Sequence, residues 1–216
     1  VYYDMGVRRI IAAREISLLD VKEIKKELPD LEIEIFVHGS MCFAYSGRCL
    51  VSAVQMGRVP NRGSCANDCR FEYTLYAGND EHGTLFRLEE EQGIGTYIFN
   101  AKDMNLASHV KEIYDSGAVD SIKIEGRTKS PYYAAVTAYA YSMALRDCEA
   151  NEFIAQKYQD ELNTTKNRGF TDAYLVHKPF EKNDTQNYDY ALSAGSYEVT
   201  GFVLENENYF MCKYKV

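Results

Sequence analysis

The sequence predicts an α/β fold built from parallel strands that are joined by crossover helices. Strand-like and helix-like stretches alternate at least three times along residues 1–150, which is the pattern of βαβ units. The chain has 216 residues, of which 46% are hydrophobic, so it can bury a sizeable core. Polar or charged residues follow each predicted strand, as they do where parallel strands carry a site at their carboxyl ends.

The first predicted unit lies before residue 40. VRRIIAARE (7–15) has the composition of a buried strand. The helix that follows is expected to begin after Ser17, with Asp20 completing a capping box, and to end at Pro29. LEIEIFVHG (31–39) then alternates apolar and charged residues before turning apolar, which indicates a second strand.

Two more strands and two helices are expected before residue 150. GTYIFNAKD (95–103) and VDSIKIEGR (119–127) are the third and fourth strands, and MNLASHVKEIYDSG (104–117) is a short helix between them. A long helix starts at SPYY, with Ser130 as its N-cap and Pro131 at its first position. The four strands are expected to lie parallel in one sheet with the helices outside, near residues 7–13, 31–37, 95–99 and 121–125.

The expected domain organisation follows from loop length and from the end of the alternation. More than fifty residues separate the second and third strands, against about 2–6 in a usual βα loop. The tail YEVTGFVLENENYFMCKYKV has the pattern of two strands around the polar turn ENEN. We therefore expect a partial barrel domain at 1–150 with an insertion at 39–94, a helix and loop at 151–180, and the start of a small β domain at 181–216.

The insertion holds most of the thiols in the chain. Four of the six cysteines lie there, with gaps of six, fifteen and three residues: Cys42, Cys49, Cys65 and Cys69. Cys148 and Cys212 lie far from them in the sequence. Residues 36–75 carry a net charge of +2 in a chain of net charge −8. The thiols therefore sit in a basic island, although a segment this short can also be basic by chance.

Several chemistries use clustered thiols, and the residues alone leave the choice open. Disulfides suit an oxidising compartment, for which nothing in the sequence argues. Structural zinc usually takes two pairs of thiols about two to four residues apart, and only Cys65 and Cys69 approach that spacing. A thiol nucleophile needs a base, and His38 precedes Cys42 closely. An iron–sulfur cluster uses all four thiols and leads, although the gaps match no ferredoxin run.

The charged residues at the predicted strand ends form a second candidate site. Lys123, Glu125 and Arg127 alternate along one predicted strand and should share a face. We expect them to converge on one cleft with His38 and Glu15. Catalytic roles are predicted for His38, Glu125 and Lys123, and substrate-binding roles for Arg48, Arg62, Arg70, Arg127 and Glu15. The alternatives are that these charges only solvate loops, or that Glu125 forms a structural ion pair.

Several blocks of the sequence resemble peptidase family U-32, the collagenase-like peptidases. EIFVHGSMCFAYSGRCLVS (34–52) is similar to the family's signature. Later family blocks are similar, in the same order, to NRGSCANDCR, GTYIFNAKDM, SIKIEGRTKSPYYAAVTAYAYSMAL and NRGFTDAYL. The resemblance covers about residues 7–175. It implies the second half of a TIM-like (β/α) barrel, followed by part of a small β domain.

Two activities attach to that family: proteolysis, and oxygen-independent hydroxylation of RNA or of ubiquinone precursors with a cysteine-bound 4Fe–4S cluster. Met104 and Asn105 stand where several members carry a further cysteine, which is similar to the branch that hydroxylates tRNA wobble uridine. The resemblance implies a 4Fe–4S cluster held by the four insertion cysteines, with Cys69 as the candidate fourth ligand. Hydroxylation is favoured over proteolysis because the sequence has no G-x-S-x-G, H-E-x-x-H or aspartic-type signature. A non-catalytic partner subunit is the third alternative.

Partners and location follow from the same interpretation. RNA is the expected substrate, a small molecule is the expected oxygen donor, and an oligomer or a partner subunit stays open. No stretch approaches the ~20 apolar residues of a membrane span, and no signal peptide is visible, so a cytoplasmic location is expected. The chain begins at Val1 and opens almost directly into a strand-like run, so we expect a piece that lacks an N-terminal portion.

Overall fold

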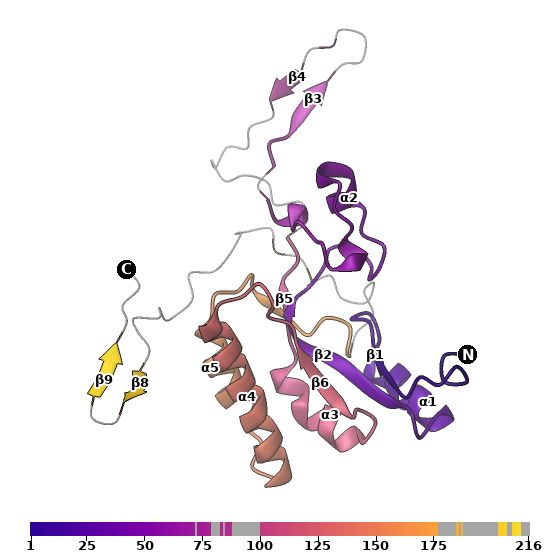
Figure 1. The fold of residues 1–216 in the computed structure, drawn as a ribbon, viewed down its shortest axis with the longest axis vertical. Coiled ribbons are helices and arrows are strands. Elements are labelled where there is room, and N and C mark those ends of the chain that lie inside the picture. Colours follow the sequence, from indigo (N-terminus) through magenta and orange to yellow (C-terminus); the bar gives the residue numbers. More distant parts are fainter. Residues whose placement is uncertain are drawn as a thin grey trace.

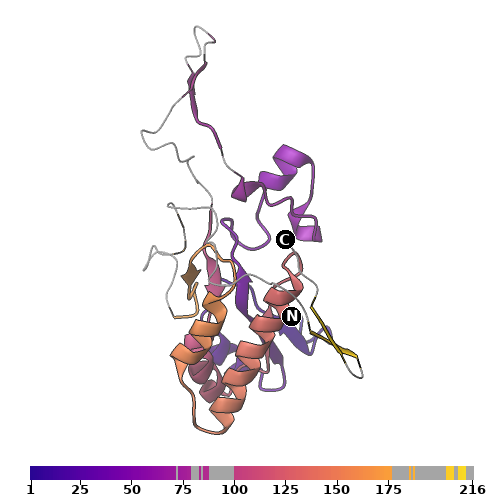
Figure 2. The same ribbon diagram turned by 90° about the vertical axis from the view of Figure 1, so that its left-hand side faces the viewer.

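The computed structural model describes residues 1–71, 73–78, 83, 85–87, 100–176, 185, 187, 203–206 and 209–212. Within these residues the fold is mixed α/β, with helices packed beside one sheet (Figures 1 and 2). The sheet contains β1 (Arg9–Ile11), β2 (Glu32–Ser40), β5 (Asp103–Asn105), β6 (Ser121–Ile124) and β7 (Phe170–Thr171). The helices beside it are α1 (Leu18–Glu27), α3 (Val110–Ser116), α4 (Pro131–Glu149) and α5 (Ala155–Asn163).

The long strand β2 is the centre of this sheet. Both β1 and β6 pair with it in parallel, so the predicted parallel arrangement is confirmed for these three strands. The expected strand at 95–99 lies outside the described residues. Ile33, Ile35 and Val37 alternate along β2 and are at most 3% exposed, because they face the helices that cover the sheet.

Two short strands differ from the sequence expectation. β5 pairs antiparallel with the end of β2, and β7 pairs parallel with β5. The prediction that a helix starts at Met104 is therefore wrong: a 3-10 turn at Ala107–His109 comes first, and α3 begins at Val110. β5 begins at Asp103, the last residue of the third predicted strand (95–103), and continues into the predicted helix. The two residues of β7 are too few to show a period of two, so they gave no strand signal.

The first strand is shorter and more exposed than predicted. Ile11 is 51% exposed, and β1 shows no buried residue along its three positions. Within the described part of the chain, β1 has β2 as its single pairing partner, and an edge strand covered on one side keeps one face in solvent. The prediction of a buried strand at 7–15 is therefore wrong in its extent and its burial.

The helix caps agree with the sequence. Ser17 and Asp20 form the expected capping box at the start of α1. Ser130 caps α4 and Pro131 opens it. Helix α4 packs between α3 and α5, and Tyr141 ties it to the sheet by donating a hydrogen bond to the Val37 carbonyl at 2.7 Å.

The insertion and the tail each hold a hairpin. The insertion contains α2 (Val51–Met56), two 3-10 turns (Pro60–Arg62 and Asp68–Arg70), and the antiparallel strands β3 (Tyr76–Gly78) and β4 (Leu85–Arg87). In the tail, β8 (Val203–Asn206) and β9 (Tyr209–Cys212) pair antiparallel; the first half of the expected turn at 205–208 belongs to β8, and its second half lies outside the described residues. Among the described helices, none combines the length and the apolar character that a bilayer crossing requires. The half-barrel and the domain limits stay predictions.

Candidate functional site

A cavity of about 380 Å³ lies where the insertion meets the carboxyl ends of β2 and β6. All four insertion cysteines line it: Cys42, Cys49, Cys65 and Cys69. The four are free thiols, as is Cys148, which is 2% exposed on α4 and does not line the cavity. The side chain of Cys212 lies outside the described residues. The structure thus brings the insertion thiols to one cavity and keeps Cys148 away from it.

The cavity wall is assembled by contacts between the two strand ends and the insertion. Gly39 has φ +128°, and a Cβ at this position would lie 2.5 Å from the Glu125 carbonyl oxygen. Only glycine allows that close approach of the two backbones. The Arg127 guanidinium donates to the Gly63 carbonyl at 3.5 Å. The end of β2 therefore packs against the start of the loop after β6, and that loop contacts the insertion at Gly63.

Glu15 joins the insertion to the end of β1. Its Oε1 accepts a hydrogen bond from the Ser46 backbone N–H at 2.8 Å. Glu15 itself does not line the cavity, whereas Ser46 does. The side chain that was predicted to bind substrate thus holds the cysteine-bearing loop instead of facing the cavity.

The Cys65 thiol is held by hydrogen bonds from its own loop. Its sulfur accepts from the Asn67 backbone N–H at 3.3 Å and lies 3.9 Å from the Ser52 hydroxyl. Ser52 is 2% exposed at the start of α2, and its hydroxyl accepts a further bond from the Ala66 N–H at 3.2 Å. These bonds fix the direction in which Cys65 points.

Desolvation and nearby cations act in opposite directions on two of the thiols. Loss of solvent around the sulfur raises the pKa of Cys42, while Arg14 and Arg70 lower it in part. Desolvation likewise raises the pKa of Cys69, against the influence of Arg70. The pKa of Cys42 is also raised by Cys65 and Cys49, and that of Cys69 by Cys42 and Cys65. Ionisation of one thiol therefore makes ionisation of its neighbours less favourable.

The cavity lining is strongly cationic. Four basic side chains contribute to it: Arg14, Arg70, Arg127 and Lys129. Among the described residues of the lining, Glu125 is the only acid. Arg70 donates to the Ser40 hydroxyl at 3.2 Å and to the Met41 carbonyl at 3.5 Å, which holds its charge beside the thiols. Such a lining favours an anionic occupant.

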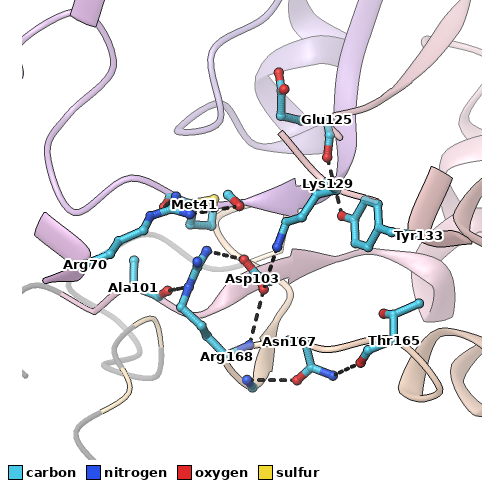
Figure 3. A network of polar contacts seen from close by, with 12 residues as sticks. Met41, Arg70, Ala101, Asp103, Glu125, Lys129, Tyr133, Thr165, Asn167 and Arg168 are labelled. Carbon is cyan, nitrogen blue, oxygen red and sulfur yellow. Dashed lines mark hydrogen bonds and ion pairs between the residues drawn. The ribbon is translucent and has the colours of Figure 1, made fainter. Parts of the chain in front are cut away.

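A buried ion network supports this wall from below (Figure 3). Asp103 is 2% exposed and binds the Arg168 guanidinium, which is 5% exposed and also donates to the Ala101 carbonyl at 2.8 Å. The Lys129 ammonium lies 3.9 Å from the same carboxylate. Burial lowers the pKa of Lys129; Arg168 and Arg70 act in the same direction and Asp103 acts against them.

Sequence reasoning missed Lys129, Asp103 and Arg168 as members of this network. Asp103 and Arg168 are 65 residues apart, so no local pattern pairs them. Each does lie within a block that resembles the family: GTYIFNAKDM, SIKIEGRTKSPYY and NRGFTDAYL. Charged residues within these blocks were the available signal.

The predicted catalytic residues lie in different places. Glu125 lines the cavity. Lys123 does not: it pairs with Glu34 at 3.6 Å and lies over the Phe36 ring. Strand β6 ends at Ile124, so the extended alternation that would place Lys123 and Glu125 on one face stops between them.

His38 lies beneath the site and does not line it. It is 1% exposed and is surrounded by the rings of Tyr133, Tyr141 and Phe170 at centroid distances of 5.6–5.7 Å. Burial lowers its pKa to about 4, so the imidazole is neutral at pH 7. Its Nδ1 lies 3.4 Å from the Tyr141 hydroxyl.

The predicted substrate-binding arginines divide into two pairs. Arg70 and Arg127 line the cavity. Arg48 and Arg62 are exposed on the insertion and do not line it. The second pair therefore lies on the outer surface of the cysteine segment.

The cavity offers the donor types that an iron–sulfur cluster uses, because four free thiols and several cations line it, but the thiols are not drawn together as ligands of one cluster would be. Within the described part of the chain, no three His, Cys, Asp or Glu side chains gather closely enough to hold a metal ion. Asp68 lies between two of the thiols in sequence, is 1% exposed, and has no hydrogen-bond partner for its carboxylate among the described residues.

Comparison with known proteins identifies relatives over most of the chain. The sequence profile of peptidase family U32 matches residues 1–185. The tRNA hydroxylation protein P of Helicobacter pylori strain J99 is 59% identical over 214 residues, which cover 99% of this chain and 51% of that protein. The Escherichia coli K12 protein of the same name is 38% identical over 89% of this chain and 50% of its own length.

A third relative acts on a different RNA. The 23S rRNA 5-hydroxycytidine C2501 synthase of Escherichia coli K12 is 37% identical over 141 residues, which cover 65% of this chain and 20% of that protein. The chain spans about half the length of the tRNA hydroxylation proteins that it matches. No solved structure matches it at a comparable level of significance.

Proposed function

The chain belongs to peptidase family U32, and we propose that it is part of an RNA hydroxylase whose substrate is the wobble uridine of tRNA. One observation carries the proposal: four free thiols and four cations line the same cavity. The names of the Helicobacter pylori and Escherichia coli tRNA hydroxylation proteins support tRNA as the substrate, and the rRNA hydroxycytidine synthase supports hydroxylation of a pyrimidine. Because the chain spans half of such relatives, the activity is proposed for the whole protein.

The cofactor in this proposal is a 4Fe–4S cluster held by Cys42, Cys49, Cys65 and Cys69. A bound cluster supplies redox-active iron at the cavity wall. Arg14 and Arg70 temper the negative charge that four thiolates bring, because both lower the pKa of Cys42. The bonds from Ser52 and Asn67 keep Cys65 oriented.

The proposed reaction exchanges a hydrogen for a hydroxyl group. The uracil carbon loses hydrogen and gains the hydroxyl group, so it is oxidised by two electrons. A small hydroxylated organic molecule loses that hydroxyl group, takes up hydrogen and is reduced by two electrons, which balances the exchange without molecular oxygen. Glu125, the acid on the lining, moves the proton from the ring carbon to the donor, and Arg127 binds the donor's anionic part.

Lys129 has a positioning role in this scheme. The Asp103–Arg168 pair anchors its ammonium from below, while its side chain reaches the cavity lining. The cationic wall therefore keeps its place when a substrate enters. Electrostatic preorganisation of this kind avoids reorganisation during the reaction.

The proposal extends to the fold and location of the whole protein. We propose that the described sheet belongs to the second half of a TIM-like barrel, that a small β domain starts near residue 181, and that the protein works in the cytoplasm. The parallel pairing of β1, β2 and β6 supports the barrel. The hairpin of β8 and β9 supports the β domain.

Proteolysis is the alternative that the family name suggests, and the site offers it less support. A thiol peptidase needs a base beside its nucleophile. Cys42 lines the cavity, but His38 is buried outside the lining and its Nδ1 faces Tyr141. A role as a non-catalytic partner subunit would leave the cationic, thiol-lined cavity without a use.

The test is the nucleoside content of tRNA in cells that lack the gene. We expect the whole protein to restore hydroxylated wobble uridine, measured by mass spectrometry, and each insertion Cys→Ala variant to abolish it. Cys148→Ala is the matched control and should restore it. Full restoration by the insertion variants, or peptide cleavage by the purified protein without any effect on tRNA, would contradict the proposal.

A further inference from the structure

Two exposed aromatic rings lie at the rim of the thiol-lined cavity. Phe43 is 46% exposed and Tyr45 is 65% exposed, and both contribute to the cavity lining. They follow Cys42 in the sequence and line the same cavity as the four thiols. Large aromatic side chains are usually buried in a folded domain, and an exposed pair beside a cavity indicates a contact surface.

Basic residues outnumber acids around these rings, although Glu125 shares the cavity lining and Glu15 accepts from the Ser46 N–H beside Tyr45. In residues 41–71, which the structure describes throughout, Asp68 is the only acid, and it is buried. Three arginines of the same segment are exposed: Arg48, Arg58 and Arg62. Arg70 and Lys129 also line the cavity; Figure 3 shows Arg70 reaching toward Met41 and Lys129 reaching toward Asp103. The surface therefore combines aromatic faces with positive charge in a chain whose net charge is −8.

We propose that Tyr45 stacks on an unpaired RNA base as the target nucleotide enters the cavity, with Phe43 as the second face and the exposed arginines on the flanking phosphates. The inference rests on the proposed function and adds the residues that hold the substrate. Single-stranded RNA is recognised by bases that stack on aromatic rings while cations track the backbone. A base that undergoes chemistry must leave its stack and needs a new stacking partner.

The same surface fits other partners less well. A protein segment that covered the rings would bury apolar surface. That contact would not explain the three exposed arginines, which have no exposed acid among them in residues 41–71. Phosphate groups at regular spacing answer that charge, and each base offers a ring face. An RNA strand therefore accounts for the rings and the cations together.

The test measures RNA affinity separately from catalysis. Fluorescence anisotropy with a labelled oligouridine and a labelled anticodon stem–loop gives the Kd of the whole protein and its variants. Tyr45→Ala should raise Kd about tenfold, since one base–aromatic stack is worth ~1–3 kcal/mol. Tyr45→Phe keeps the ring and should stay within about twofold. Tyr139→Ala, which removes a 52% exposed ring from α4, is the matched control and should not change Kd.

The outcomes separate this inference from the proposed function. Unchanged RNA affinity and unchanged hydroxylation in Tyr45→Ala, with hydroxylation still lost in the cysteine variants, would overturn the stacking role and leave the hydroxylase proposal standing. Tyr45-dependent RNA binding in a protein that hydroxylates nothing would support the stacking role and defeat the hydroxylase. A fall in unfolding free energy without a change in Kd would mean that a protein segment covers Tyr45, and would also overturn the inference.

Discussion

The sheet with its helices and the cysteine insertion differ in the exposure of their large side chains and in the pairing of their buried acids. In the sheet region two of the largest side chains, Tyr141 and Tyr158, are at most 1% exposed. In the insertion Leu50 and Val54 are 70% and 81% exposed. The buried acid of the sheet region, Asp103, has a cation beside it, whereas Asp68 in the insertion has no described hydrogen-bond partner. The buried acid of the sheet region is thus paired, whereas the insertion exposes large apolar side chains and buries a carboxylate that has no described hydrogen-bond partner.

The largest effect should come from breaking the buried pair of the sheet region. Arg168→Met removes the guanidinium from Asp103 and leaves a buried carboxylate with Lys129 as its remaining cation. We expect the free energy of unfolding to fall by about 3–5 kcal/mol in chemical denaturation. Arg9→Met removes the Arg9–Glu32 pair, whose side chains are 54% and 49% exposed, and should lower the free energy of unfolding far less. Equal losses of unfolding free energy in both variants would contradict the expectation that the buried ion pair contributes more than the exposed one.

His38 should make the sheet region sensitive to acid. Its pKa is about 4 in the folded protein against an ordinary value of 6.5. The unfolded chain therefore binds a proton that the folded chain does not, and stability present above pH 6.5 is lost as the pH falls toward 4. The loss should be about 3 kcal/mol. His38→Gln should flatten this part of the stability–pH curve, whatever its effect at pH 7; an unchanged slope would show that other groups cause it.

Gly39 lies at the junction of the two regions, and its substitution by alanine should be more destabilising than the same substitution at a glycine inside the insertion. Gly39→Ala places a Cβ 2.5 Å from the Glu125 carbonyl oxygen at a φ of +128°. We expect it to cost about 2–3 kcal/mol. Gly57→Ala also has a positive φ, but its Cβ would meet no atom within 4 Å, so it should cost about 1 kcal/mol. Thermal unfolding of both variants compares the junction with the insertion.

The sequence predicted long elements well and distant partners poorly. The caps at Ser17 and Ser130 and the pattern of β2 are local signals, and the structure confirms them. β7 and the Asp103–Arg168 pair depend on residues far apart in the chain, which no local pattern reports. The shared cavity of the four thiols was predicted from their clustering, while the separation of Lys123 from it depends on where β6 ends.

The cysteines offer the most direct test of the contrast between the two regions. Whole protein purified without air should carry a full 4Fe–4S complement of iron and sulfide, and should keep it in Cys148→Ala and Cys212→Ala. Changing Cys42, Cys49, Cys65 or Cys69 to Ala should lower the iron content sharply, because each removes a proposed ligand from the cavity wall. Iron that survives in all four insertion variants, or that depends equally on Cys148, would contradict the account.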